Sequence, residues 1–168
     1  TPAYTTNTSD DHLYLLRDSG AKTVIVSTET LLEKLLPAAR KVPALEMVVV
    51  MDHSVTSDFG DFNICRWIDL LSEGPLLERD RLIDGINRTD SACIIYTSGT
   101  SGNPKGVLLS HGAILCNCKG AHMFLRDVPG FKQGCETFLS FLPLSHSYEH
   151  TCGQFLPISI GAQIFYAE

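Results

Sequence analysis

Long apolar runs are missing from this sequence of 168 residues: none approaches the roughly 18 consecutive apolar residues that a membrane-spanning helix needs. Clusters of Lys or Arg are also missing, and the net charge is −6, which argues against a nucleic-acid-binding surface. No signal-peptide pattern opens the sequence. We therefore expect a cytoplasmic protein without a nucleic-acid partner.

The six cysteines form no C-x-x-C pair and no regular framework of the kind seen in disulfide-rich or zinc-binding proteins. Four of them, Cys93, Cys116, Cys118 and Cys152, lie in apolar or helical surroundings. In a reducing cytosol such residues usually behave as small buried hydrophobic side chains. The hydrophobic content of 44% and the charged content of 19% are those of an ordinary globular protein, long enough to form one core.

The pattern of apolar residues predicts alternating helices and strands. Helices are predicted over residues 10–18 (with Leu13, Leu16 and Tyr14 facing inward), from 27 or 28 to 41, 67–72, 110–125 and 146–156. Strands are predicted over residues 23–26, 47–51, 93–96, 107–109, 138–142 and 162–166, whereas residues 52–66 are predicted to be irregular. This order is typical of an α/β fold with a mostly parallel sheet and helices on both faces.

One loop combines four hydroxyl side chains, three glycines and a lysine: Thr97, Ser98, Gly99, Thr100, Ser101, Gly102, Asn103, Pro104, Lys105 and Gly106. Glycines let a backbone curl with its N–H groups inward, which creates an anion-binding concavity. The hydroxyls add neutral donors or a metal ligand, and the lysine adds a positive charge. The pattern predicts a nucleoside triphosphate site; the structural alternative is a flexible serine–glycine turn, which seldom carries a lysine beside a proline.

The loop differs from a Walker motif, which reads G-x-x-x-x-G-K-[S/T] and opens a helix. Here Lys105 lies between Pro104 and Gly106, and the apolar residues after it predict a strand. Proline fixes its own φ and biases Asn103 toward an extended conformation, which disfavours a helix start. We therefore expect a phosphate loop between two strands, at the carboxyl end of the first, where ligands bind in open α/β sheets.

Residues 96–106, with the following residues 107–111, resemble the signature of the AMP-forming acyl-CoA synthetase and adenylate-forming enzyme superfamily. Residues 142–150, Leu-Pro-Leu-Ser-His-Ser-Tyr-Glu-His, resemble the substrate-site motif of its long-chain fatty acid branch. The segment 7–22 is similar to the region that precedes the loop in those enzymes, so the resemblance covers essentially the whole chain. Ser101 and Ser110 replace the usual threonines and keep a hydroxyl.

The resemblance implies a reaction in two halves. A carboxylate and ATP form acyl-AMP and pyrophosphate, and the thiol of coenzyme A then displaces AMP. Thr97, Ser98 and Thr100 would hydrogen-bond the β- and γ-phosphates, with the backbone of residues 99–102 closing around them. Thr97 is the candidate Mg²⁺ contact, because that ion prefers oxygen ligands. Lys105 would neutralise phosphate charge or hold the loop in place.

A second group of side chains that could act in catalysis or binding consists of His146, Tyr148, Glu149 and His150. By resemblance, His146 is catalytic and lies beside the adenylate-forming centre, and Tyr148 and Glu149 are substrate-site candidates. An imidazole can donate to a carboxylate or an α-phosphate without being a permanent cation. Two alternatives stay open: the letters also match the H-x-x-E-H zinc pattern, and the same groups could simply cap a helix after Pro143.

The chain begins at Thr1 without a methionine and ends in a strand-like run, and enzymes of the resembled family are several times longer. We expect residues 1–168 to be a partial AMP-binding (adenylation) domain that lacks the C-terminal lid domain, and the isolated piece to be inactive. The whole protein is predicted to be a long-chain fatty acid–CoA ligase whose fatty substrate would bring it into peripheral contact with a membrane. The alternatives are an adenylating enzyme for an amino or aryl acid, or a non-catalytic nucleotide-binding module.

Overall fold

The computed structural model describes residues 1–54, 62–73, 83–97 and 103–167. Two compact units make up the chain: one is Thr5–Arg79, and the other combines Thr1–Tyr4 with Asp80–Glu168. The expected α/β class is confirmed, since two of the three sheets found among the described residues consist of parallel strands. Within the same ranges, no helix has the length and apolar character needed to cross a membrane.

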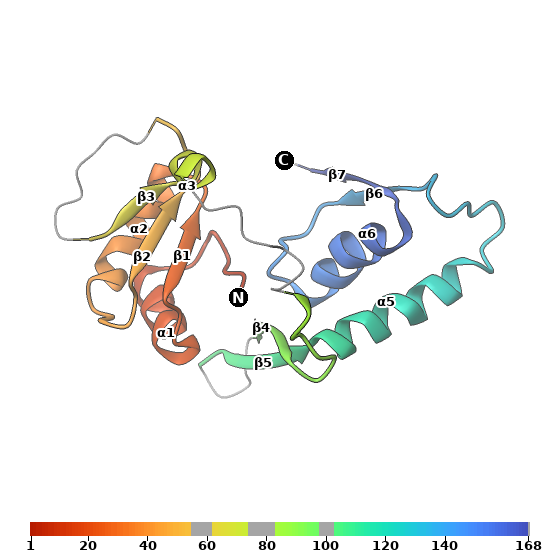
Figure 1. The fold of residues 1–168 in the computed structure, drawn as a ribbon, viewed down its shortest axis with the longest axis horizontal. Helices are drawn as coiled ribbons and strands as arrows, with labels where there is room; N and C mark the ends of the chain where they lie inside the picture. The colour runs from red at the N-terminus through yellow and green to blue at the C-terminus, as the bar shows by residue number, and fades with distance from the viewer. Residues whose placement is uncertain (55–61, 74–82, 98–102, 168) are drawn as a thin grey trace. The chain divides into compact units, whose positions relative to one another are not determined.

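The unit Thr5–Arg79 contains a parallel three-stranded sheet with the order β1-β2-β3. Its elements are α1 (Ser9–Ser19), β1 (Thr23–Val26), α2 (Glu29–Ala39), β2 (Met47–Val50), β3 (Ile64–Arg66) and α3 (Trp67–Glu73). Helices α1 and α2 pack against each other beside the strands (Figure 1). One buried apolar cluster joins Leu16 of α1, Val26 of β1, Leu32 of α2 and Val48 of β2, so the helices and the sheet share one core.

Local signals set the helix ends of this unit. Thr8 accepts a hydrogen bond from the backbone N–H of Asp11 and its own backbone N–H donates to the Asp11 carboxylate, which forms a capping box. Gly20 ends α1 in the left-handed conformation, with φ of 63°. Thr28 caps α2. Of the residues predicted to face inward on α1, Leu16 is buried and Leu13 is half-buried against the core. Tyr14 is half-buried, and Leu15, which was not predicted to face inward, is buried as well.

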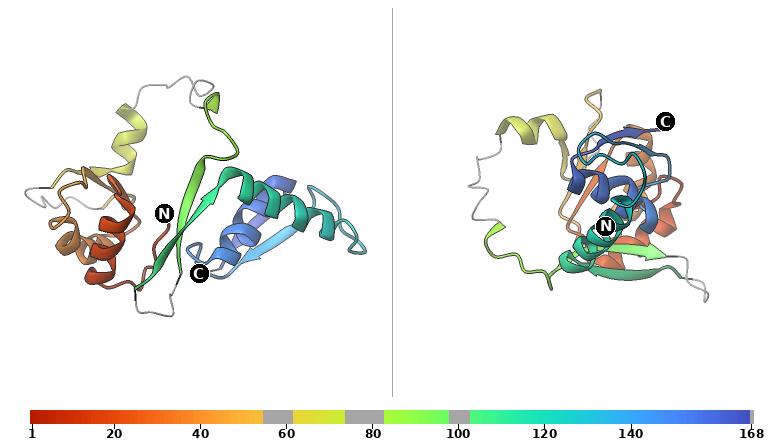
Figure 2. Two further views of the ribbon diagram at one scale, coloured as in Figure 1. Left: turned by 90° about the horizontal axis from the view of Figure 1, so that it is seen from below. Right: turned by 90° about the vertical axis from the view of Figure 1, so that its right-hand side faces the viewer.

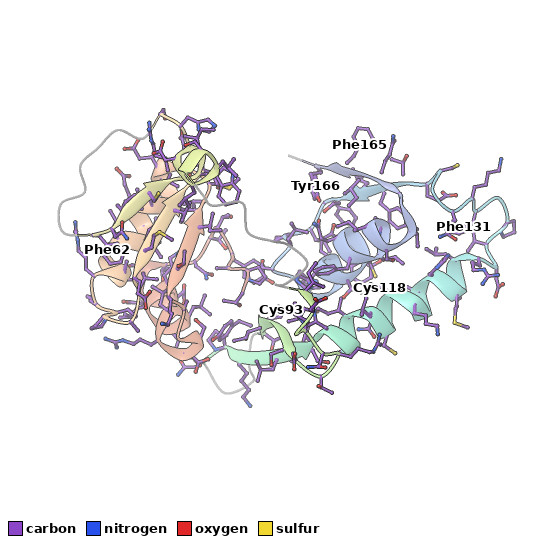
Figure 3. All side chains as sticks on the ribbon, viewed as in Figure 1. Phe62, Cys93, Cys118, Phe131, Phe165 and Tyr166 are labelled. Atoms are coloured by element: carbon purple, nitrogen blue, oxygen red, sulfur yellow. The ribbon has the colours of Figure 1, made fainter. Side chains whose placement is uncertain are left out.

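The irregular structure predicted for residues 52–66 was wrong at its end. Residues Ile64–Arg66 form β3, in which Ile64 lies opposite Val48 of β2. Three residues are too short to show an apolar period, and pairing with the neighbouring strand decides their conformation. Phe62, labelled in Figure 3, is half-buried and packs against the core of this unit.

The second unit contains an antiparallel hairpin and a parallel pair of strands. Its elements are β4 (Ser91–Thr97), β5 (Lys105–Ser110), α5 (His111–Leu125), β6 (Thr137–Ser140), η1 (Glu149–Phe155), α6 (Leu156–Ile160) and β7 (Gln163–Tyr166). Strands β4 and β5 are antiparallel, and β6 and β7 are parallel. Figure 2 shows that β5 leads directly into α5, whose first turn is capped by Ser110.

The core of the second unit lies between α5 and α6. Ile114 and Cys118 of α5 are buried with Leu156 and Ile160 of α6, and Phe131 packs against this cluster (Figure 3). Ala121 and Leu125 of α5 pack against the same cluster, so these four residues form one buried stripe along the helix. Its neighbour Cys116, which was expected to be a buried hydrophobic residue, is exposed because it faces away from that stripe.

The single helix predicted over residues 146–156 was wrong in type and extent. Glu149–Phe155 is a π-helix, η1, and it continues into α6, which ends at Gly161 with φ of 73°. Pro157 falls in the first turn of α6, where its missing N–H costs no helical hydrogen bond. Single-turn π-helices often mark functional sites in proteins.

Candidate functional site

The hairpin β4–β5 presents the two ends of the predicted phosphate loop. Thr97 is the last residue of β4 and lies directly opposite Lys105, the first residue of β5. Both side chains are exposed. A hydroxyl and an ammonium group therefore stand side by side at the mouth of the loop, where both can reach the same anion.

The rest of the predicted loop is only partly described. Asn103 is exposed and Pro104 is half-buried, and Gly106 lies within β5. The candidates Ser98, Gly99, Thr100, Ser101 and Gly102 lie outside the described residues. The expected setting between two strands is confirmed, since β5 begins at Lys105 and the first helix after the loop begins only at His111.

A contact that the sequence did not predict lies beneath this mouth. Gly106 is paired across the hairpin with Tyr96, and a Cβ at residue 106 would lie 3.2 Å from the Tyr96 ring atoms Cε1 and Cζ. It would also lie 2.9 Å from Cγ2 of Ile94. Glycine is thus the residue that allows this close approach of the two strands.

His146 is exposed and its ring is oriented by the backbone that follows it. The backbone N–H of Tyr148 donates to Nδ1 of His146 over 3.2 Å. A neutral imidazole whose Nδ1 accepts carries its proton on Nε2, so the free nitrogen is a hydrogen-bond donor. The turn is held on both sides, because the His146 N–H donates to the Pro143 carbonyl and the His150 N–H donates to the His146 carbonyl.

The two substrate-site candidates lie in different surroundings. Tyr148 is 59% exposed, whereas Glu149 is only 2% exposed and has no hydrogen-bond partner at Oε1 within the described part of the chain. The carboxyl group of Glu149 fills the space beside Gly153, where a Cβ would lie 2.5 Å from its Cδ. Burial, and next the negative charge of Glu149, raise the pKa of the Cys152 thiol.

The second histidine of this stretch is packed as an aromatic residue. The His150 ring makes an edge contact with Phe155, with 4.8 Å between ring centroids. Burial lowers the pKa of the His150 imidazole. Across residues 1–54, 62–73, 83–97 and 103–167, no group of three or more His, Cys, Asp or Glu side chains is placed to hold a metal ion.

Comparison with known proteins decides the family. The sequence matches the family described as AMP-binding enzyme over residues 1–168. The chain belongs to the AMP-binding enzyme family.

Two fatty acid–CoA ligases are similar to this chain in sequence. The chain is 33% identical over 171 aligned residues to the long-chain-fatty-acid–CoA ligase ACSBG2 of Mus musculus, with 98% of this chain and 25% of that protein covered. It is 30% identical to the long-chain-fatty-acid–CoA ligase ACSBG1 of Homo sapiens, with 100% of this chain and 23% of that protein covered. The chain therefore spans about a quarter of the length of these relatives.

Solved structures share the fold of this AMP-binding chain. The anthranilate CoA ligase AuaEII, solved with anthranoyl-AMP, superposes with a TM-score of 0.77 at 23% identity, covering 99% of this chain and 29% of that one. The benzoate CoA ligase of Burkholderia xenovorans superposes with a TM-score of 0.73 at 21% identity, again over 99% of this chain and 29% of that one. At these identities the likeness establishes the fold.

Proposed function

We propose that the whole protein is an AMP-forming long-chain fatty acid–CoA ligase, which activates a fatty acid with ATP to acyl-AMP and transfers the acyl group to coenzyme A. The observation that carries this proposal is the pairing of Thr97 with Lys105 at the mouth of a glycine- and hydroxyl-rich loop, in a chain that matches AMP-binding enzymes throughout. The two named relatives support a fatty acid as the substrate.

In this proposal the hairpin binds the triphosphate of ATP. The exposed ammonium group of Lys105 supplies positive charge, and the hydroxyl of Thr97 supplies a donor or a metal ligand. Residues Ser98, Thr100 and Ser101 would add hydroxyl donors, and residues 99 and 102–104 would add backbone and side-chain contacts. Lys105 makes no ion pair with any described residue, which leaves its charge for the phosphates.

Mg²⁺ fits this donor set. Magnesium is commonly bound by one or two protein oxygens together with substrate phosphates, so the exposed Thr97 hydroxyl suffices as one protein ligand. When bound, the ion would neutralise charge on the phosphate oxygens. The remaining protein ligands are proposed to lie outside this chain.

His146 is the proposed catalytic residue. The attack of a carboxylate on the α-phosphorus brings two anions together, so the site must supply directed donors where the charge collects. The Nε2–H of His146 is such a donor, because the Tyr148 N–H occupies Nδ1. Tyr148, which is exposed two residues further on, is proposed to contact the acid, whereas the buried Glu149 would shape the site from beneath.

We also propose that the protein works in the cytoplasm on small-molecule substrates and touches a membrane only peripherally, through its fatty substrate. The net charge of −6 supports the absence of nucleic acid from its partners.

The decisive experiment is ATP–pyrophosphate exchange by the whole protein with palmitate as the acid. Exchange that depends on palmitate, followed by palmitoyl-CoA formation when coenzyme A is added, is the expected result. Exchange with an aryl or amino acid and none with palmitate would point instead to a different adenylating enzyme. ATP binding without exchange for any acid would point to a nucleotide-binding module.

A further inference from the structure

Gly106, the second residue of β5, lies beside two side chains of the partner strand β4. This residue is paired with Tyr96, and the space that its missing Cβ leaves is filled by the Tyr96 ring and by Cγ2 of Ile94. Ile94 and Tyr96 are two residues apart on β4, so their side chains lie on one face and both border Gly106 from that face. Two side chains of β4 therefore occupy the space that a Cβ at residue 106 would need.

The neighbouring pair along the ladder is Thr97 with Lys105. Side chains alternate between the faces of a strand, so this pair projects on the face opposite the Tyr96–Gly106 contact. The spacing and twist of the strands at one pair are transmitted to the next through the shared backbone. A change at Gly106 therefore moves the residue that carries the positive charge.

The Ile94 side chain cannot easily move away to make room for a Cβ at residue 106. The Cγ2 atom of Ile94 is attached directly to its Cβ, and a β-branched side chain has few χ1 positions available. A methyl group at residue 106 would meet this atom at 2.9 Å and the Tyr96 ring at 3.2 Å, closer than carbon atoms ordinarily pack. The strands would have to separate or twist to accept it.

We propose that Tyr96 and Gly106 are positioning residues for nucleotide binding: the ring of Tyr96 seated on Gly106 sets the strand spacing that places Lys105 opposite Thr97. This inference rests on the proposed ATP-binding role of the hairpin. In this proposal Gly106 acts through its missing side chain, which lets the two strands pair at this spacing. That role differs from the contacts that the loop itself would make with phosphate.

The test compares four single variants of the whole protein. Gly106→Ala adds the clashing methyl group, Tyr96→Ala removes the ring, and Tyr96→Phe keeps the ring without its hydroxyl. Gly120→Ala is the matched control, because a Cβ at this α5 residue meets no atom within 4 Å. For each variant, the affinity for a fluorescent ATP analogue is measured by titration, and KM for ATP, KM for palmitate and kcat are measured by pyrophosphate exchange.

We expect Gly106→Ala and Tyr96→Ala to weaken nucleotide affinity and raise KM for ATP by on the order of tenfold or more, as small misplacements in binding sites do. KM for palmitate stays near the wild-type value, and Gly120→Ala behaves as wild type. Tyr96→Phe, which keeps the ring, loses less nucleotide affinity than Tyr96→Ala. A double variant, Ile94→Leu with Gly106→Ala, moves the branch away from Cβ and is expected to recover part of the lost affinity.

Unchanged nucleotide affinity in Gly106→Ala would overturn the inference, as would equal losses toward ATP and palmitate. If Gly106→Ala does not fold, Tyr96→Ala decides, because it adds no atoms; wild-type affinity in that variant would overturn the inference as well. A wild-type protein that binds the analogue but shows no palmitate-dependent exchange would refute the ligase proposal. The nucleotide affinities of the variants would still test whether Tyr96 and Gly106 position the nucleotide site.

Discussion

Lys105 and Thr97 face each other as the terminal pair of the β4–β5 ladder, so each end of the predicted phosphate loop carries a group that can bind an anion. Replacing Lys105 with Ala removes a charged donor, which is expected to raise KM for ATP by roughly ten- to a hundredfold. The measurement is pyrophosphate exchange by the whole protein at fixed palmitate. Lys119→Ala, at an exposed residue of α5, is the control, and a similar rise in that variant would contradict a specific role for Lys105.

The hydrogen bond from Tyr148 N–H to Nδ1 of His146 leaves Nε2 as the ring nitrogen that can donate to a bound group. Substitution with Gln places an amide nitrogen near the position of Nε2, whereas Asn places one near Nδ1. We expect His146→Asn to lower kcat of exchange by roughly a hundredfold, as the loss of a transition-state donor does, and His146→Gln to retain more of it. Equal activity of the two variants would argue against a donor role for Nε2.

The carboxyl group of Glu149 occupies the space that a side chain at Gly153 would need, within the same helix η1. Gly153→Ala would place a methyl group 2.5 Å from Cδ of Glu149, and such overpacking is expected to lower the free energy of unfolding by roughly 1–3 kcal/mol. In a Glu149→Ala background the same substitution should cost much less, because the competing carboxyl group is gone. Urea unfolding of the four proteins in this cycle measures the coupling; an identical cost in both backgrounds would exclude it.

Thr8 caps α1 by accepting a hydrogen bond from the backbone N–H of Asp11, and its hydroxyl donates to the Asp11 carboxylate over 2.7 Å. The hydrogen bonds from Thr8 hold the pKa of the Asp11 carboxyl below its ordinary value. Thr8→Ala is expected to lower the free energy of unfolding by about 1 kcal/mol. The matched control is Thr6→Ala, an exposed residue before the helix, which should change stability far less in the same urea titration.

His12 gives the stability of the chain a dependence on pH. Burial lowers the pKa of its imidazole below the ordinary value of 6.5, opposed by the nearby charge of Asp11. As the pH falls, the unfolded chain takes up this proton before the folded chain does, so the folded state loses stability below pH 6.5. Urea unfolding at pH 7.5 and 5.0 should show a smaller loss for His12→Gln than for wild type. A larger loss in the variant would reverse the sign of this argument.

Much of the fold follows from interactions between residues close in the sequence. The helix starts near Thr28 and Ser110 were predicted because serine and threonine are preferred at helix N-caps, where their hydroxyls accept from a backbone N–H three residues later. The helix α5 and the strand β1 were predicted because the apolar pattern of each lies within a single element. The proline before Lys105 predicted that a strand, not a helix, would follow the loop.

The remaining features depend on partners that the sequence does not reveal. Strand β3 exists because β2 offers it a pairing edge, and its three residues carry no period of their own. The burial of Glu149 depends on the packing of η1 against α5 and β6, since a glutamate on an isolated helix would face water.

By itself, the sequence determined the α/β class, the loop between two strands and its positive and hydroxyl groups, because residue type and local spacing specify these. Only the tertiary structure decided that Thr97 faces Lys105, that the Tyr96 ring lies beside Gly106, and that His146 accepts at Nδ1 from the Tyr148 N–H. Each of these relationships is a distance between groups, and such distances are set by strand register and backbone hydrogen bonds rather than by composition.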